Sequence, residues 1–342
     1  MVGIREVAKR AGVSAATVSR VLNNDKTMTV TPETREKIIE SVNFFNYSKK
    51  KYSPKVRDSI GMITTVSEIK ELEDLYFRAI RIGIEKEAKR SNISLKKVIR
   101  LPETSLDMNM FNDCAAILLI GQVLPQTIEE IRATRSEVIV IDDPSAPSNV
   151  DAVYTDLKLP TIKHLERLYK KGHRNMIFIG GKRIVLDKNG KEFITEGDQR
   201  QLAYEEWMEE KDLNKYKKVY LGDWTTLDGL SLGELFLKDY QGKTMPTAIV
   251  VASDPIAVGV YRALQRHNIK IPQDVSVVSF DNIEVAEYLT PSLSTVNIET
   301  EEIGKIAVRL AKDHINKTRK VPIRVTVPSE IIIRESEQET TH

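Results

Sequence analysis

The chain has 342 residues, of which 41% are hydrophobic, so it can bury more than one packed core. No apolar run approaches the roughly 20 residues that a membrane-spanning helix needs, and charges stand where a secretory peptide would be apolar. We therefore expect a multidomain cytoplasmic protein. The single cysteine, Cys114, excludes an intramolecular disulfide, and its apolar neighbours predict a buried side chain rather than a nucleophile.

Positive charge is concentrated at the N-terminal end. Residues 1–58 contain 12 lysines and arginines and 6 acidic residues, whereas the whole chain has a net charge of only +2. Because phosphate neutralisation is the main sequence-independent contribution to DNA affinity, this asymmetry predicts a polyanionic partner for the N-terminal segment. Charge alone leaves a solvated basic tail as the alternative.

Three short helices are predicted in residues 1–46, the first two joined by a glycine turn. Gly12 permits the tight turn and Ser14 can cap the second helix. Thr31 followed by Pro32 is a typical start for the third. The residues expected to form a shared core are Ile4, Val7, Ala8, Ala11, Val13, Val18, Val21, Leu22, Ile38, Ile39 and Val42. This arrangement is typical of a helix-turn-helix.

The second helix carries side chains suited to reading DNA. If Ser14 is its cap, the first turn contains Ala15 and Ala16, whose methyl groups can meet thymine methyls in the major groove. Arg20, one turn further along, can bond guanine O6 and N7. The residues suited to phosphate oxygens are Thr17, Ser19 and Asn23. The alternative is a plain three-helix interaction domain with Arg20 on a solvated face.

The strings from Ile4 to Asn23 and from Thr31 to Arg35 closely resemble the DNA-binding domain of the lactose/galactose repressor family of transcription regulators. The resemblance implies base reading by Ala15, Ala16 and Arg20, and phosphate contacts by Ser14, Thr17, Ser19 and Asn23.

The linker at 47–58 departs from the family pattern. Family members usually continue with a Tyr-x-Pro-Asn stretch and a short helix whose leucine enters the minor groove. This segment is shorter, has no leucine and contains Pro54, which would interrupt a helix. We expect an electrostatic linker that tracks phosphates, with an unstructured spacer as the alternative. Its basic residues are Lys49, Lys50, Lys51, Lys55 and Arg57.

From Ser59 onward, short apolar runs alternate with amphipathic helical stretches. The expected strands are 60–66, 116–120, 138–141, 176–179, 219–221, 248–252 and 275–280, with helices at 75–88 and 128–133. This rhythm predicts two lobes, each a doubly wound parallel sheet covered by helices on both faces. A ligand is expected in the crevice at the strand ends.

This part also resembles the family, which implies a core similar to periplasmic sugar-binding proteins, with three chain crossings between the lobes. The landmarks are Lys171-Gly172-His173-Arg174, Gly180-Gly181, Val251-Ala252-Ser253-Asp254, Val277 to Asp281 and Pro291 to Val296. The expected core spans 59–334, with an N-lobe of about 59–155 and 288–318, a C-lobe of about 156–287 and 319–334, and a polar tail at 335–342.

The resemblance also implies an effector site. Arg200 matches the family's effector-binding arginine, and Asp281 matches an aspartate that accepts hydroxyl hydrogen bonds. Ser253, Asp142 and Trp224 would face the same cleft, and the indole ring could stack on a sugar. For Arg200 and Asp281 the alternative is an interlobe salt bridge, and for Trp224 it is a place in the core.

The run from Glu71 to Phe77 includes Tyr76, a further candidate contact, and replaces the asparagine-proline-phenylalanine turn of many relatives. Acidic groups there suit a hydroxyl-rich ligand and disfavour a phosphorylated one. With the run from Leu221 to Trp224, it is more similar to the galactose and galactoside repressor branch, which implies galactose or a galactoside as effector. A capped, solvated helix start explains the same acids without a ligand.

Together these features predict a homodimeric transcription repressor that binds double-stranded operator DNA and whose affinity a small sugar controls. The alternatives are a sugar-binding carrier and a sugar-transforming enzyme with the same two-lobed fold. A carrier would have no use for a helix-turn-helix. The five histidines lack metal-ligand spacing, and no nucleophile with a positioned base can be named, so we expect no enzyme activity, metal or cofactor.

Overall fold

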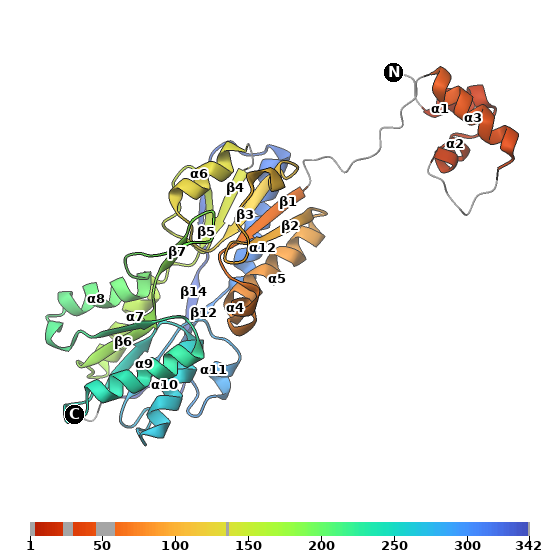
Figure 1. Cartoon of the computed structure of the whole chain (residues 1–342). Helices are drawn as coiled ribbons and strands as arrows, with labels where there is room; N and C mark the ends of the chain where they lie inside the picture. The colour runs from red at the N-terminus through yellow and green to blue at the C-terminus, as the bar shows by residue number, and fades with distance from the viewer. Residues whose placement is uncertain (1–3, 23–29, 46–58, 135–136, 341–342) are drawn as a thin grey trace. The chain divides into compact units, whose positions relative to one another are not determined.

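The computed structural model describes residues 4–22, 30–45, 59–134 and 137–340. The chain divides into two compact units, Met1–Lys55 and Val56–His342, whose described parts we call the head and the core. Figure 1 shows a head built of helices and a core built of helices and strands. The predicted fold class is confirmed. Among the described helices, none combines the length and apolar composition that spanning a membrane requires.

The head contains α1 (Ile4–Ala11), α2 (Ala15–Leu22) and α3 (Pro32–Phe44). Gly12 turns the chain between α1 and α2 at a φ of +68°, a left-handed conformation that glycine adopts without steric cost. The Ser14 side chain caps α2 by accepting a hydrogen bond from the Thr17 amide at 3.0 Å. Thr31 caps α3 in the same way through the Thr34 amide. The buried core residues are Val7, Ala8, Ala11, Val18, Val21 and Ile38.

Ile39 was predicted to join this core, but it does not. It is 47% exposed, because a helix turns by about 100° per residue and the preceding Ile38 is fully buried. Phe45 packs against the core instead. Phe44 is exposed, and the Arg10 guanidinium carbon lies 3.6 Å from its ring centre in a cation–π contact.

Six parallel strands form the N-lobe sheet, in the order β13-β5-β4-β3-β1-β2. They are β1 (Ser59–Thr64), β2 (Ser94–Arg100), β3 (Ala116–Ile120), β4 (Glu137–Ile141), β5 (Asp151–Tyr154) and β13 (Arg324–Thr326). The helices are α4 (Glu68–Glu73), α5 (Leu75–Arg90), η2 (Met108–Phe111), α6 (Pro125–Ala133) and α12 (Thr300–Asn316). Helices α5 and α12 approach so closely that a Cβ on Gly304 would lie 2.1 Å from the Ile80 carbonyl oxygen. Cys114 is buried as predicted, and burial raises the pKa of its thiol to about 11.

Four parallel strands form the C-lobe sheet, in the order β11-β10-β6-β9. They are β6 (Met176–Gly181), β9 (Val219–Gly222), β10 (Ala248–Val251) and β11 (Ser276–Val278). The helices are α7 (Lys158–Lys170), α8 (Gln199–Glu210), η3 (Asn214–Tyr216), α9 (Thr226–Asp239), α10 (Asp254–Arg266) and α11 (Val285–Tyr288). Between β6 and α8 the chain forms an antiparallel hairpin of β7 (Ile184–Leu186) and β8 (Glu192–Ile194).

Three described segments connect the lobes: the passage from β5 to α7, and the antiparallel strands β12 (Thr295–Ile298) and β14 (Ser329–Ile332). Two boundaries differ from the sequence-based division. Leu293 is fully buried in the C-lobe, so the return to the N-lobe begins at β12 rather than at residue 288. Because β13 pairs with β5, the segment around it belongs to the N-lobe. Asp151 holds this segment through the Arg319 guanidinium at 2.8 Å, a contact that hydrophobic periodicity does not reveal.

The predicted polar tail is, as far as residue 340, part of the C-lobe. Ser336 and Glu337 are buried, although both are polar. The Ser336 hydroxyl donates to the Val277 carbonyl at 2.6 Å, and Arg167 donates to the Glu337 carboxylate at 2.9 Å. The tail packs because each buried polar group has a partner.

Candidate functional site

A cleft of about 520 Å³ lies between the two lobes of the core, lined by both. It is placed at the carboxyl ends of the strands, where open parallel sheets bind ligands: Asp142 follows β4, Asp223 follows β9 and Ser253 lies just beyond β10. All six residues predicted to contact an effector line it: Tyr76, Asp142, Arg200, Trp224, Ser253 and Asp281.

Arg200 is held at the start of α8 by Asp198, which also caps that helix. Its Nε donates to Asp198 Oδ1 at 2.6 Å and its Nη2 to Oδ2 at 3.0 Å, a bidentate pair, while Nη1 donates to the Ala252 carbonyl at 2.7 Å. Burial would raise the pKa of Asp198, but the charge and hydrogen bonds of Arg200 outweigh burial and hold that pKa below its usual value. The predicted alternative, an interlobe salt bridge with Asp281, is wrong: the ion-pair partner of Arg200 is Asp198, in the same lobe.

Trp224 both lines the cleft and packs against the C-lobe core. Its Nε1 donates to the Lys182 carbonyl at 3.0 Å, and the Arg200 guanidinium carbon lies 4.8 Å from its ring centre. Gly181 leaves the space that the ring fills, since a Cβ there would approach the ring to 2.2 Å. The two sequence interpretations of Trp224 therefore both describe part of its environment.

The N-lobe wall of the cleft contributes a tyrosine–aspartate pair. The Tyr76 hydroxyl donates to Asp142 Oδ1 at 2.7 Å. Asp142 has a φ of +66°, a conformation that costs energy in most residues and that aspartate tolerates better than most. Burial raises the pKa of Asp142 to about 7, and burial also raises the pKa of Asp74, which caps α5 beside Tyr76.

The C-lobe wall presents Asp281 and Ser253. Burial, together with the negative charge of Asp254, raises the pKa of Asp281 well above its usual range. Its φ is +107°, so this backbone is also strained. The Ser253 hydroxyl is buried and has no hydrogen-bond partner among the described residues. Buried carboxyl groups and a hydroxyl group that line a cleft can donate hydrogen bonds to the hydroxyl groups of a ligand and accept hydrogen bonds from them.

Sequence reasoning missed several cleft residues. Asp198 precedes the α8 helix and could have been predicted as its cap, from an aspartate before a helical pattern. The hairpin contributes Ile184, Leu186 and Glu192, and no motif pointed to them. Within the part of the chain that the structure describes, no group of three histidine, cysteine or acidic residues could hold a metal ion.

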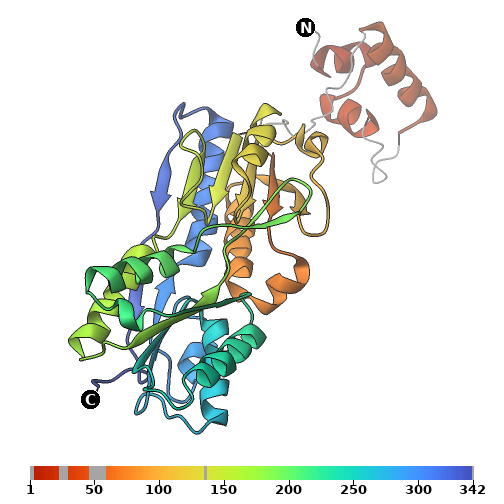
Figure 2. The same cartoon turned by 60° about the vertical axis from the view of Figure 1, so that its left-hand side comes forward.

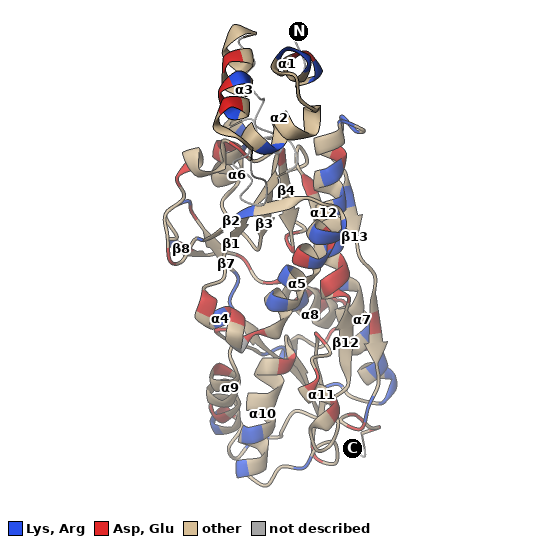
Figure 3. Cartoon of the chain, turned by 90° about the vertical axis from the view of Figure 1, so that its right-hand side faces the viewer, with Lys and Arg blue, Asp and Glu red and all other residues tan. Residues whose placement is uncertain are grey.

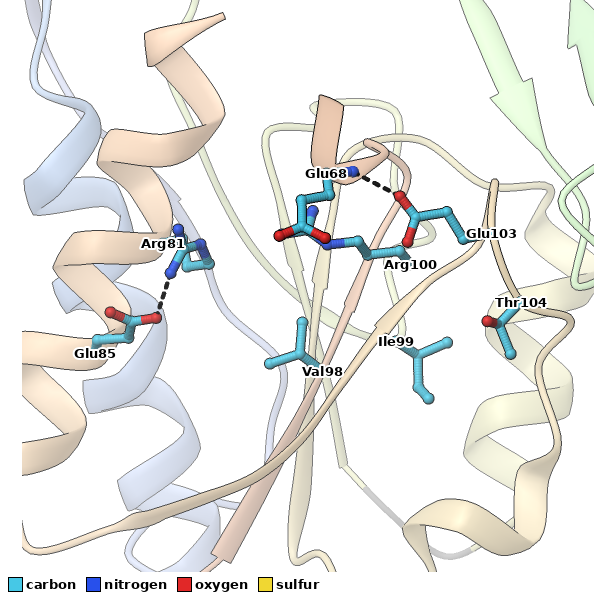
Figure 4. A pocket seen from close by; sticks show the side chains of 8 residues that line it. All are labelled: Glu68, Arg81, Glu85, Val98, Ile99, Arg100, Glu103 and Thr104. Carbon is cyan, nitrogen blue, oxygen red and sulfur yellow. Dashed lines mark hydrogen bonds and ion pairs between the residues drawn. The ribbon is translucent and has the colours of Figure 1, made fainter. Parts of the chain in front are cut away.

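A second cavity of about 420 Å³ lies beside strand β2 of the N-lobe (Figure 4). Its arginines are already paired: Glu71 binds both Arg81 and Arg100, and Arg81 also binds Glu85. Burial would raise the pKa of Glu71, but hydrogen bonds from the two arginines outweigh burial and lower it. Both arginines that line this cavity are therefore already occupied by carboxylates.

In the head, α2 presents the predicted DNA-contacting residues. Ala16 and Arg20 are exposed and lie four residues apart, so they share one face of the helix. Ala15 is half-buried against the head core, and the Ser14 hydroxyl already caps α2. Thr17 and Ser19 are half-buried. Figure 3 shows mixed charges along α3, in contrast to the mostly uncharged α2. Asn23 and the predicted linker residues Lys49, Lys50, Lys51 and Arg57 lie outside the described residues.

Two family models match the chain. Residues 3–50 match bacterial regulatory proteins of the lacI family, and residues 165–337 match a periplasmic binding protein-like domain. The first match covers the head and the second covers most of the C-lobe together with parts of the N-lobe.

Full-length relatives agree with these matches. The chain is 33% identical to the HTH-type transcriptional regulator GanR of Bacillus subtilis, over 98% of this chain and 99% of the relative. It is 30% identical to the HTH-type transcriptional repressor MelR of the same species, over 98% and 97%. The structure of a transcriptional regulator CelR–cellobiose complex matches with a TM-score of 0.69, covering 98% and 100% of the two chains at 21% identity. The chain therefore belongs to the lacI family of bacterial regulatory proteins, and it is a transcription regulator with a helix-turn-helix head and a periplasmic-binding-protein-like core.

Proposed function

We propose that this regulator is a repressor of carbohydrate-utilisation genes that binds operator DNA through α2 and responds to an uncharged sugar in the interlobe cleft. The observation that carries the proposal is the chemistry of the cleft. Its most buried cation, Arg200, is already neutralised by Asp198. The cleft is also lined by the Tyr76–Asp142 pair, by Asp281 and by the Ser253 hydroxyl, which has no hydrogen-bond partner among the described residues. The cellobiose bound by the structural neighbour supports the same ligand class.

The balance of charge favours a neutral, hydroxyl-rich ligand over a phosphorylated one. Asp74, Asp142 and Asp281 line the cleft, and burial already raises the pKa of each carboxyl group. A phosphate would add negative charge beside them and make their ionised forms still less favourable, whereas a neutral hydroxyl group can hydrogen-bond to a carboxyl group in either protonation state. Of the other cations that line the cleft, Lys70 is exposed, Lys182 is half-buried, and Arg183 is occupied by hydrogen bonds to N-lobe residues. The run of residues that resembles the galactoside repressor branch favours galactose or a galactoside among such ligands.

On the DNA side, two heads of a homodimer would each place α2 in the major groove of one operator half-site in the bacterial cytoplasm. Ala15, Ala16 and Arg20 would read base edges, and Ser14, Thr17, Ser19 and Asn23 would contact phosphates together with the basic linker. Sugar binding would shift the lobes toward an arrangement in which the heads no longer fit both half-sites. The protein acts by binding and catalyses no reaction on the sugar.

The direct test measures operator release by fluorescence anisotropy, after the operator has been identified by selection from a random duplex library. Galactose, lactose, glucose, cellobiose and glucose 6-phosphate are then titrated into the complex. We expect release by a neutral sugar and none by the phosphate ester. Release by glucose 6-phosphate alone would contradict the proposed ligand class, and turnover of any of the sugars would contradict the absence of catalysis.

Asp281→Ala is expected to leave operator affinity unchanged and to weaken sugar binding roughly five- to a hundredfold, because a buried sugar hydroxyl left without its hydrogen-bond partner costs about 1–3 kcal/mol. Stability should not fall, since burial and Asp254 already disfavour the Asp281 carboxylate. Calorimetric titration with sugar and urea unfolding measure the two effects, with the exposed Glu284→Ala as control. If sugar released DNA from the Asp281→Ala variant as it does from the wild type, Asp281 would not be part of the effector site.

Sugar affinity is expected to rise with pH up to about 7 and to level off above it. The Asp142 carboxyl has a pKa of about 7 without ligand because it is buried. A sugar hydroxyl that donates to the carboxylate favours the ionised form, so binding lowers this pKa and releases a proton. The dissociation constant should therefore decrease by up to tenfold per pH unit as pH rises toward 7. Asp142→Asn should flatten this profile, and an unchanged profile in that variant would assign the proton to another group.

A further inference from the structure

The β7–β8 hairpin belongs to the C-lobe by sequence but lies against the N-lobe in space. The chain leaves the C-lobe after strand β6, forms the hairpin, and returns to the C-lobe at helix α8. Figures 1 and 2 both show this green hairpin reaching across to the yellow strands and loops of the other lobe. A fourth described segment therefore joins the lobes, in addition to the three crossings.

Backbone hydrogen bonds fix the hairpin to the N-lobe. The Leu186 amide donates to the Gln122 carbonyl at 3.1 Å, and the Leu124 amide donates to the Leu186 carbonyl at 2.9 Å. Near the tip, the Leu106 amide donates to the Lys188 carbonyl at 2.7 Å. These bonds continue the edge of the N-lobe structure just beyond β3, so the hairpin cannot slide along that lobe without breaking them.

Side-chain packing reinforces this attachment. Leu186 is 3% exposed, and every other buried residue of its hydrophobic cluster belongs to the N-lobe. Gly190 turns the tip at a φ of +78°, and a Cβ there would lie 2.1 Å from the Leu101 carbonyl oxygen. Arg183 donates from Nε to the Gln122 side chain at 2.7 Å, and from Nη2 to the Ser145 hydroxyl at 2.7 Å.

The same hairpin forms part of the cleft wall through Ile184, Leu186 and Glu192. We infer that the β7–β8 hairpin is a fixed, specificity-determining wall that limits the length of the sugar chain the cleft accepts on that side, an inference that rests on the proposed function. Its anchorage to the N-lobe keeps the wall in place when a ligand is bound. Glu192, which is exposed on the wall, accepts hydrogen bonds from the sugar unit that reaches it.

The test compares two sugar series of increasing length: galactose, lactose and galactosyl-lactose, and glucose, cellobiose and cellotriose. In one variant residues 185–193 are replaced by Gly-Ser-Gly, and in a milder one Leu186→Ala loosens the anchorage. Ile194→Ala is the matched control, because this side chain is on the same hairpin, is 69% exposed and does not line the cleft. Circular dichroism and thermal unfolding check that each protein is folded.

We expect the wild type and the Ile194 variant to bind the best shorter sugar at least tenfold more tightly than the trisaccharide of its series. In the shortened variant, the affinities for the best shorter sugar and for the trisaccharide should differ by about threefold or less. Leu186→Ala should reduce the difference in the same direction. Tight wild-type binding of a trisaccharide, or an unchanged ratio in the shortened variant, would overturn the inference. If the wild type binds no sugar of either series, the proposed function fails instead.

The anchorage itself is tested without any ligand. Hydrogen exchange of the Leu124 amide, which donates to the hairpin, should be at least tenfold faster in Leu186→Ala than in the wild type or in Ile194→Ala. Equal exchange rates in the three proteins would show that the hairpin is not held as inferred, whatever the sugar results.

Discussion

Arg200→Ala is expected to lower the free energy of unfolding of the core by about 3–5 kcal/mol and to abolish the response to sugar. The side chains of Arg200 and Asp198 are only 9% and 15% exposed, so little solvent screens this pair. Removing the guanidinium leaves the Asp198 carboxylate without its bidentate partner in the cleft, and a buried charge without a partner is strongly destabilising. The Ala252 carbonyl and one face of Trp224 lose a contact as well.

Urea unfolding of the variants separates the ion pair from the sugar contact. The double variant Asp198→Ala/Arg200→Ala should recover much of the lost stability, because neither charge is then left alone, yet it should not respond to sugar. The pKa of Asp198 is held below its usual value of 3.8, so the pair stabilises the fold above that pH, and its contribution is lost as pH falls through the folded-state pKa. The stability difference between wild type and Arg200→Ala should shrink as pH falls, because burial raises the pKa of the unpaired Asp198 in the variant, which then takes up a proton before the ion-paired Asp198 of the wild type does. A single variant as stable as the wild type at pH 7 would refute this account of the pair.

The parts of the fold that the sequence predicts best are strands buried on both faces. The runs that became β1, β3, β4, β6 and β10 are continuously apolar, because helices cover both sides of each sheet. Strand β2 escaped prediction since it is an edge strand with exposed Lys96 and Lys97, which break the apolar pattern. The three-residue strands β7 and β8 have no periodicity of their own, and contacts with the other lobe define them.

The candidate cleft shows a similar division. Tyr76, Asp142 and Arg200 were named from family resemblance or from their place at a strand end, and the fold brings them together. Their partners depend on local geometry, and the resemblance did not supply the pairing of Arg200 with Asp198. The predicted positions of the tail and of the β13 segment were wrong for a related reason. Polar residues that have partners inside the protein cannot be told from solvent-exposed residues in a sequence.

Arg20→Ala is expected to weaken binding to the identified operator by about 1–3 kcal/mol per half-site, roughly five- to a hundredfold for each head. The arginine is exposed on α2, on the same face as Ala16, so the substitution removes no core packing and alanine preserves the helix. The loss should be largest at one base pair of each half-site, since a bidentate arginine contact discriminates guanine from other bases. Anisotropy titrations against single-base operator variants measure this pattern.

Lys37→Ala is the matched control, since Lys37 is also exposed in the head and its replacement removes the same charge from α3. The slope of log affinity against log salt then separates two roles for Arg20. An arginine that only neutralised phosphate would, on removal, weaken binding on every sequence alike and reduce the slope by about one. Removal of a base-reading arginine leaves the slope nearly unchanged. At one operator position, the variant should then bind the original base pair and its substitutes with equal affinity. Uniform weakening with a reduced slope in Arg20→Ala would reassign this residue to the backbone, and sequence recognition would then have to come from the exposed methyl of Ala16 and its neighbours on α2.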